Sequence, residues 1–387
     1  MTAANRLASV QEYYFSKKLQ EVNEMKSRGC DIINLGIGSP DLLPPNEAID
    51  ALSNSLLDNN SNGYQSYRGL LELREAMAHF YAAHFSISLD PLTEVLPLMG
   101  SKEGIMHISM AFLNPGDHVL IPNPGYPTYE SVSRLVEAVP VFYDLDETSD
   151  WLPNLDHLVQ MDLSKVKLMW INYPHMPSGA KASVTILTDL VAFAQKHNIL
   201  LVNDNPYSLI LNDQPLSLIS IPGSRHCCLE LNSISKTFNM SGWRVGMVVG
   251  DKIMIDHILK VKSNMDSGMF YGLQKGSIVA LQSNDQWFDT LNKTYNDRRQ
   301  LVWQLAEELG GHFQKDNAGM FVWLKLPEGT QSIEFSERIL HDYHIFTTPG
   351  DIFGSQGKGY LRLSLCLEAA RIKEAIHRIK HKLKHDS

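Results

Sequence analysis

Hydrophobic residues in the middle of the chain are grouped into short apolar runs that alternate with longer amphipathic stretches. In the stretch 185–198, Leu187, Leu190 and Val191 fall on one face of a helix. Thr185 is placed to cap that helix. Nearly continuous apolar strands separated by helices predict a mainly parallel sheet with helices on both faces. The expected strands occupy residues 118–122, 139–145, 166–172, 199–204, 227–233 and 244–250.

The pattern changes after about residue 285, where a long polar helical stretch leads into a different kind of unit. Apolar runs at 319–326 and 360–365 predict strands there, and each is followed by a helical pattern. The first 40 or so residues contain little predicted sheet, so we expect them to pack against this unit. The predicted fold is α/β, with an N-terminal segment packing on the small domain (1–45), a large domain built on the parallel sheet (46–285) and a small C-terminal α+β domain (286–387).

Composition and charge exclude several classes of protein. The 387 residues carry a formal net charge of −9, which argues against a nucleic acid or an anionic membrane as the main partner. No apolar stretch is long enough to cross a bilayer, and the N-terminal residues lack the apolar core of a signal peptide. The four cysteines form no CxxC pair and no zinc-type spacing with histidine, so we expect a reduced, cytoplasmic protein without a metal site.

Polar side chains follow three of the predicted strands at their carboxyl ends, where ligands bind in sheets of this type. A lysine in such a partly buried position can have an amine pKa low enough to form a Schiff base. Arg244 and the neighbouring serines could donate charge-assisted hydrogen bonds to a phosphate. The polar residues at this edge are Asn172, Asp204, Tyr207, Ser233, Ser235 and Lys236.

The spacing around Lys236 matches a known pattern. Ser233 lies three residues before Lys236, and Arg244 lies eight residues after it. In these motifs the sequence resembles the aspartate aminotransferase family, the fold-type-I enzymes that use pyridoxal 5′-phosphate. The resemblance implies that Lys236 is the Schiff-base lysine, that Asp204 in "DNPY" keeps the cofactor's pyridine nitrogen protonated, and that Tyr207 binds the ring's 3′-oxygen. Lys236, Asp204 and Tyr207 are therefore the expected catalytic residues.

The resemblance covers nearly the whole chain and implies further binding residues. Ser101 and Lys102 in "GSK", where a helix is predicted to begin, would join Ser233, Ser235 and Arg244 around the phosphate, because a helix N-terminus favours an anion. Tyr126 in "NPGYPTY" would stack on the cofactor ring. Arg362 in "YLRLSLC" would bind the substrate α-carboxylate through two of its guanidinium nitrogens, next to the backbone of Gly38.

Tyr64 in "GYQSYRGLL" has the spacing of the family's tyrosine that reaches the phosphate of the neighbouring subunit. If Tyr64 has this role, an isolated subunit has an incomplete site, and the resemblance therefore implies a homodimer. A loop tyrosine that packs locally is the alternative.

The activity implied is amino-group transfer between an L-amino acid and a 2-oxo acid by a ping-pong mechanism, with Lys236 removing and returning the α-proton. The resemblance is strongest to the prokaryotic branch of aspartate, alanine and LL-diaminopimelate aminotransferases. The segment "KSNMDSGMF" (262–270) is similar to one found in the last group. The residue that contacts the substrate side chain is left open, with Arg68, Lys262 and Tyr14 as candidates.

Other functions stay open at this point. The same cofactor site could carry out C–S β-elimination. A non-catalytic regulator of this fold would normally have a DNA-binding module, and this acidic chain offers no separate N-terminal domain for one. A hydrolase or dehydrogenase without the cofactor is disfavoured, because "GIG" (36–38) is followed by "SPDLLPP" rather than a helix and no nucleophile elbow is present.

Met176 in "NYPHMPSGA" (172–180) departs from the family pattern. The family has an asparagine here that donates a hydrogen bond to the cofactor's 3′-oxygen, and a thioether cannot do so. We therefore assign Met176 no such role. Two explanations remain: Met176 packs against the ring edge as a soft apolar contact, or the missing donor alters the proton chemistry of the site.

Overall fold

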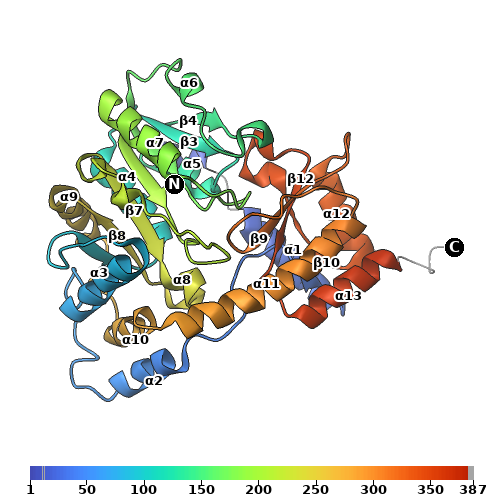
Figure 1. Cartoon of the computed structure of the whole chain (residues 1–387), viewed down its shortest axis with the longest axis horizontal. Helices are drawn as coiled ribbons and strands as arrows, with labels where there is room; N and C mark the ends of the chain where they lie inside the picture. Colours follow the sequence, from blue (N-terminus) through green and yellow to red (C-terminus); the bar gives the residue numbers. More distant parts are fainter. Residues whose placement is uncertain (11, 13, 382–387) are drawn as a thin grey trace.

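The computed structural model describes residues 1–10, 12 and 14–381. The chain forms a large unit around a central sheet and a smaller unit beside it, and the long helix α11 (Asp285–Glu308) runs from the first to the second (Figure 1). Within the described part of the chain, no helix combines the length and the hydropathy needed to cross a membrane.

The central sheet has seven strands in the order β2-β8-β7-β6-β5-β3-β4. All neighbours from β7 to β4 are parallel, whereas β8 is antiparallel to both β7 and β2. This confirms the predicted α/β fold with a mainly parallel sheet, and each expected strand is present. The strands are β2 (Val95–Leu98), β3 (His118–Asn123), β4 (Val139–Asp144), β5 (Val166–Ile171), β6 (Leu200–Asp204), β7 (Cys228–Ser233) and β8 (Gly246–Gly250).

The inner strands of this sheet are buried on both faces, which explains why they are mostly apolar, whereas the edge strand β4 is partly exposed. In β5, Leu168 and Trp170 belong to the core on one face, and Met169 and Ile171 belong to the core on the other. Helices α4, α5 and α9 supply the first core, and α3 and α7 contribute to the second. The helices of the large unit are α2 (Asn46–Ser55), α3 (Leu71–Phe85), α4 (Ser101–Phe112), α5 (Pro127–Leu135), α6 (Leu155–Leu158), α7 (Val184–His197), α8 (Ile234–Thr237), α9 (Lys252–Lys262) and α10 (Tyr271–Leu281).

Helix α7 begins at Val184, two residues earlier than a cap at Thr185 would allow, and its cap is a different residue. The Oγ of Ser183 accepts a hydrogen bond from the backbone N–H of Ile186 at 3.2 Å, so Ser183 is the N-cap. The prediction of Thr185 as the cap was wrong, because Thr185 already lies inside the first turn.

The smaller unit contains a three-stranded antiparallel sheet in the order β11-β12-β9. Its strands and helices are β9 (Phe321–Lys325), β11 (Thr348–Pro349), β12 (Tyr360–Ser364), α12 (Ser332–Tyr343) and α13 (Ala369–Lys380). The N-terminal segment adds to this unit, since β1 (Ile33–Asn34) pairs in parallel with β10 (Ile345–Phe346). Helix α1 (Tyr14–Ser27) is fixed to α12 by the buried Lys18, whose ammonium lies 2.6 Å from the carboxylate of Glu337.

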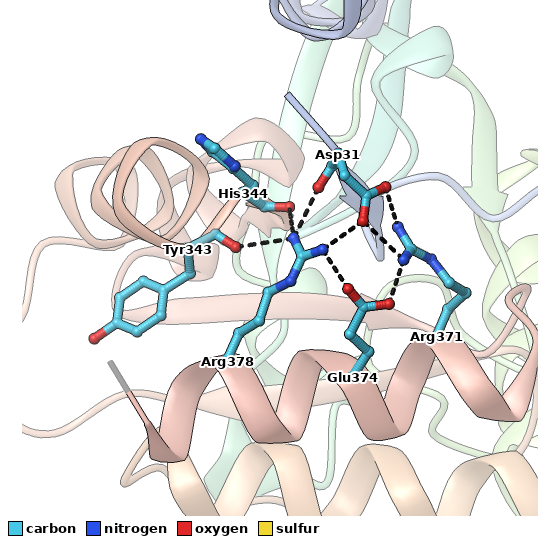
Figure 2. A network of polar contacts seen from close by, with 6 residues as sticks. All are labelled: Asp31, Tyr343, His344, Arg371, Glu374 and Arg378. Atoms are coloured by element: carbon cyan, nitrogen blue, oxygen red, sulfur yellow. Dashed lines mark hydrogen bonds and ion pairs between the residues drawn. The ribbon is translucent and has the colours of Figure 1, made fainter. Parts of the chain in front are cut away.

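A polar network ties the residues just before β1 to α13 (Figure 2). The carboxylate of Asp31 accepts hydrogen bonds from Arg371 (2.9 Å) and Arg378 (2.5 Å). Glu374 forms ion pairs with both arginines. The hydrogen bonds from Arg371 and Arg378, together with their charges, lower the pKa of Asp31 to about 2. The two arginines of α13 thus join the C-terminal end of the chain to Asp31 near its N-terminal end.

We propose on these contacts that residues 1–45, 46–285 and 286–387 are the structural units of the chain. The pairing of β1 with β10 supports the first assignment. The start of α11 at Asp285, from which the helix runs to the small unit, supports the boundary at 285 (Figure 1). Residues 382–387 of the third unit lie outside the described residues.

Candidate active site

A cavity of about 540 Å³ lies at the carboxyl ends of β5, β6 and β7, and the small unit contributes part of its wall. Every residue predicted from the sequence to have a catalytic or binding role lines this cavity, with the exception of Tyr64, whereas the three candidates for contact with the substrate side chain do not line it. The predicted residues that line it are Gly38, Ser101, Lys102, Tyr126, Asp204, Tyr207, Ser233, Ser235, Lys236, Arg244 and Arg362.

Asp204, the last residue of β6, is a buried carboxylate in the cavity wall. The hydroxyl of Tyr129 donates to its Oδ2 at 3.0 Å, while Oδ1 has no hydrogen-bond partner among the described residues. Burial raises the pKa of Asp204 to about 7, against the effect of the Tyr129 hydrogen bond. A buried carboxyl group with one unused oxygen fits a cavity ligand that brings a cationic donor.

Lys236 lies on the short helix α8, which follows β7 directly. Its ammonium donates to the backbone carbonyl oxygen of Gly38 at 2.7 Å. Burial lowers the pKa of Lys236, and the charges of Arg362 and Arg244 lower it further. The amine is therefore easier to deprotonate than a surface lysine, as a nucleophile or a general base requires.

One end of the cavity has the features of an anion site. Helix α4 begins at Ser101, after Gly100 with a positive φ of 92°, and a side chain at Gly100 would collide with the Arg244 guanidinium. Burial and the nearby charge of Arg244 both lower the pKa of Lys102. Two cations near one helix N-terminus are stabilised by a bound anion.

Two serines close the same end of the cavity from the side of β7. Ser233 Oγ donates to Ser235 Oγ at 2.8 Å, and it accepts the backbone N–H of Ser235 at 3.2 Å. Both side chains line the cavity, so their hydroxyls add polar groups to the anion site.

Arg362 projects from β12 and is buried against aromatic rings. Its guanidinium carbon lies 4.1 Å from the ring centroid of Phe321 and 4.8 Å from that of Phe353. Nη2 donates to the backbone carbonyl of Gly36 at 2.7 Å, and Nη1 lies 3.2 Å from the sulfur of Met176. The stacked rings hold the guanidinium plane in one orientation, as two-point binding of a carboxylate needs.

Met176 is buried in the wall of the cavity, where its sulfur lies beside the Arg362 guanidinium. Its backbone N–H donates to Oδ1 of Asn172 at 2.8 Å, which fixes the turn. The neighbouring His175 does not line the cavity and so does not supply a donor in place of the family's asparagine. Its ring nitrogens lie 2.7 Å from Ser178 Oγ and 3.1 Å from the carbonyl oxygen of Pro124, and burial lowers the pKa of His175 to about 4.

The two remaining cavity tyrosines are held by other aromatic rings. Tyr126 is the N-cap residue of α5, and its ring packs edge-on against Tyr129 with centroids 5.6 Å apart. Tyr207 follows β6 and packs edge-on against Phe321 at 5.9 Å. Burial raises the pKa of the Tyr207 phenol, so its hydroxyl stays protonated and able to donate.

Four other residues considered from the sequence lie away from this cavity. Tyr64 is 93% exposed and contributes nothing to the site of its own chain. Arg68 pairs with Asp256 at 2.5 Å. Lys262 is buried and forms an ion pair with Asp266, and Tyr14 is likewise outside the cavity wall.

Sequence reasoning missed several residues of the cavity. One of them is Tyr129, which donates a hydrogen bond to Asp204 and stacks on Trp170 with ring centroids 5.0 Å apart. Its position about one helical turn after Tyr126, near the start of α5, could have indicated from the sequence that it lies close to the site. The apolar wall gave no such signal, because apolar residues in helices and strands are usually core residues. That wall consists of Phe15, Leu19, Ile37, Met176, Phe321 and Phe353.

Comparison with known proteins gives one consistent result. Residues 30–379 match the family model "Aminotransferase class I and II". The chain is 40% identical over 383 residues to the LL-diaminopimelate aminotransferase of Maridesulfovibrio salexigens, with 97% of this chain and 98% of the relative covered. It is 37% identical over 380 residues to the enzyme of the same name from Aquifex aeolicus, covering 98% of each chain.

Solved structures agree with the sequence comparison. The BacF structure from Bacillus subtilis superposes with a TM-score of 0.94 and 34% identity, and 98% of each chain is covered. The aromatic aminotransferase of Pyrococcus horikoshii superposes with a TM-score of 0.85 and 29% identity, covering 93% of this chain and 97% of the other. The chain therefore belongs to the class I and II aminotransferases, which are enzymes that use pyridoxal 5′-phosphate.

Proposed function

We propose that the protein transfers an amino group between an L-amino acid and a 2-oxo acid, with Lys236 as the residue that moves the α-proton. One observation carries this proposal: a buried lysine of lowered pKa, a carboxylate with an unused oxygen, an anion site and a buried arginine all line the same cavity.

The residues present fit pyridoxal 5′-phosphate on two counts. The unpartnered Oδ1 of Asp204 suits a protonated ring nitrogen, because a cation beside it compensates the burial of the carboxylate. The absence of a Cβ at Gly100 leaves room for the Arg244 guanidinium at the start of α4, where a phosphate would bind. When bound, the cofactor supplies an electron-withdrawing ring that stabilises negative charge at the substrate's α-carbon.

The protein's own residues would bind the cofactor and substrate and would transfer the proton. Ser101, Lys102, Ser233, Ser235 and Arg244 would hold the phosphate end. Arg362 would bind the α-carboxylate and so orient the Cα–H bond toward Lys236. Lys236, with its lowered pKa, would take the α-proton as a neutral amine and return it as an ammonium. Tyr207 would donate its hydroxyl hydrogen to an acceptor oxygen in the cavity.

Amino transfer can be tested directly with the cofactor-loaded protein. An active amino donor should give one equivalent of its 2-oxo acid per site without an acceptor, and continuous turnover once a second 2-oxo acid is added. Mass spectrometry of both products is the measurement. Repeated release of pyruvate from a cysteine-type donor without an acceptor would indicate β-elimination instead, and a protein that takes up no cofactor would contradict both activities.

Replacing Arg362 by alanine should reduce kcat/KM for the amino donor by about 100-fold or more, because a buried two-point contact with a carboxylate is lost. Retention of the cofactor should change far less, since Arg362 comes from β12, whereas the residues proposed to hold the phosphate come from other elements such as α4 and β7. The exposed Arg338→Ala on α12 is a matched control. Equal losses of turnover and of cofactor in Arg362→Ala would show that Arg362 is structural.

We also propose that the active form is a homodimer in which Tyr64 reaches the phosphate of the neighbouring site. The 93% exposure of an aromatic side chain next to the segment that starts α3 supports this. Tyr64→Phe should weaken cofactor binding about tenfold in a titration, the usual loss for one hydrogen bond to a charged group. Tyr67→Phe on the same loop is the control. Unchanged affinity in Tyr64→Phe, or a monomer in sedimentation, would contradict the proposal.

The printed names of the relatives make LL-diaminopimelate one candidate amino donor, beside aspartate and alanine. The four cysteines form no disulfide, which supports a location in a reducing compartment such as the cytoplasm.

A further inference from the structure

We propose that Asn123 is a positioning residue for the carboxylate site, because its side chain holds residues 353–356 against the end of β3 and so keeps the Phe353 ring on the Arg362 guanidinium. The inference rests on the proposed function, in which Arg362 binds the α-carboxylate, and it gives a role to a residue outside the cavity wall. Asn123 is the first residue of "NPGYPTY", the segment from which Tyr126 reaches the cavity.

The side chain of Asn123 joins the large unit to the small unit. It is 5% exposed, and its Nδ2 donates to Oδ1 of Asp144 at 2.6 Å and to Oγ of Ser355 at 2.8 Å. Its Oδ1 accepts the backbone N–H of Gln356 at 3.2 Å. Asp144 in turn accepts from Nε2 of Gln356 at 2.9 Å. Both the donor and the acceptor of the Asn123 amide are used, so an aspartate or a leucine of similar size could not make the same contacts.

The backbone of the small unit approaches Asn123 closely at Gly354. This glycine has a φ of 128°, and a Cβ at its position would collide with Oδ1 of Asn123. On the other side of the contact, the backbone N–H of Gly125 donates to the carbonyl oxygen of Phe353 at 2.8 Å. The main chain of Phe353 is therefore held by the residues that follow β3.

Phe353 connects this contact to the carboxylate site. Its buried side chain lines the cavity, and its ring centroid lies 4.8 Å from the guanidinium carbon of Arg362. Arg362 itself projects from β12 of the small unit, so the stack of ring and guanidinium depends on the contact between the two units. A guanidinium that loses one of its rings can take more orientations, and two-point binding of a carboxylate needs a single one.

Asn123→Ala in the holoenzyme tests the proposal through both substrates, using the donor and the acceptor that are most active in the amino-transfer assay. Both carry the α-carboxylate, so we expect KM for each to rise by the same factor, about tenfold, while kcat changes about twofold or less. The Kd of pyridoxal 5′-phosphate, from titration of the cofactor-free protein, should stay near that of the wild type. Asn114→Ala, at an exposed position just before β3, is the matched control.

Two results of this experiment would overturn the proposal. Parallel losses of kcat, substrate binding and cofactor affinity would show that Asn123 only links the two units. A higher KM for one substrate alone would place the effect away from the carboxylate that both substrates share. Failure of every donor to yield a 2-oxo acid with the wild-type protein would instead contradict the proposed function itself.

A double variant shows whether Asn123 acts through the Phe353 ring. Phe353→Leu alone should raise both KM values about tenfold, because the stack on Arg362 is lost. Adding Asn123→Ala to Phe353→Leu should raise them further by about twofold or less, since the two changes interrupt the same chain of contacts. Multiplied effects of the two substitutions would contradict this route.

Ser355→Ala gives a milder test at an exposed position, where folding is not at risk. It removes one acceptor of the Asn123 amide and should raise both KM values about threefold. If Asn123→Ala does not fold, Ser355→Ala decides the proposal, and unchanged KM values in this variant would overturn it.

Discussion

Replacing Lys236 by alanine should lower the rate of amino transfer by about 1000-fold or more. General acid–base catalysis by a positioned side chain contributes about 10²–10⁴-fold, and the Lys236 amine lies in the cavity 2.7 Å from the carbonyl oxygen of Gly38. The measurement is single-turnover formation of the 2-oxo acid by the cofactor-loaded protein, which separates chemistry from product release.

A chemical test of the same residue does not depend on turnover. Borohydride reduction of the holoenzyme should attach the cofactor covalently to Lys236, and mass spectrometry of the digested protein should find the label on that peptide. The exposed Lys165→Ala is the control and should keep both activity and labelling. Covalent label on a different lysine, or full activity in Lys236→Ala, would remove Lys236 from its proposed role.

Asp204→Asn should lower kcat by about 100-fold or more with the protein still folded. Asparagine keeps the size of the side chain and can accept a hydrogen bond, but it cannot compensate a cationic ring nitrogen. The loss should fall mainly on kcat rather than on KM for the amino donor, because Asp204 lies on β6 and the proposed carboxylate site lies on β12. A loss confined to KM would show that Asp204 contacts the substrate instead.

The same substitution should change how the cofactor-free protein responds to pH. The pKa of Asp204 is 3.8 in its ordinary state and about 7 in the folded protein, so the unfolded chain binds fewer protons between these values. Stability therefore falls as the pH rises from about 4 to about 7, by roughly 4 kcal/mol for a shift of this size. Asp204→Asn lacks this contribution and should lose less stability over that interval in denaturant titrations. Parallel pH profiles for the two proteins would contradict the raised pKa.

Much of the fold could be predicted from local patterns. The continuous apolar runs located the strands because a sheet buried on both faces needs apolar residues at every position, as in β5 with Leu168, Met169 and Trp170. The polar residues of the site could be named because they stand out at strand ends. Lys236 and Asp204 are examples, and both line the cavity.

Other features depend on tertiary contacts and leave little trace in the sequence. Phe15 and Leu19 fit an ordinary amphipathic helix, and only the docking of α1 by Lys18 on Glu337 places them at the cavity. The contact between Met176 and Arg362 likewise joins residues 186 positions apart, so sequence spacing could not reveal it. The cap of α7 was missed for a local reason, since Ser183 and Thr185 are both suitable capping residues two positions apart.

The pairing of β1 with β10 has a consequence for the order in which the chain folds during synthesis. The first strand leaves the ribosome early, but its partner includes Phe346, which is made only after the whole large unit has been translated. The large unit is continuous in sequence and can form its sheet in the meantime. Residues 33–34 have no backbone hydrogen-bond partner in β10 until residues 345–346 have been synthesised. Arg362 and the wall around it are therefore assembled last, when the beginning and the end of the chain meet.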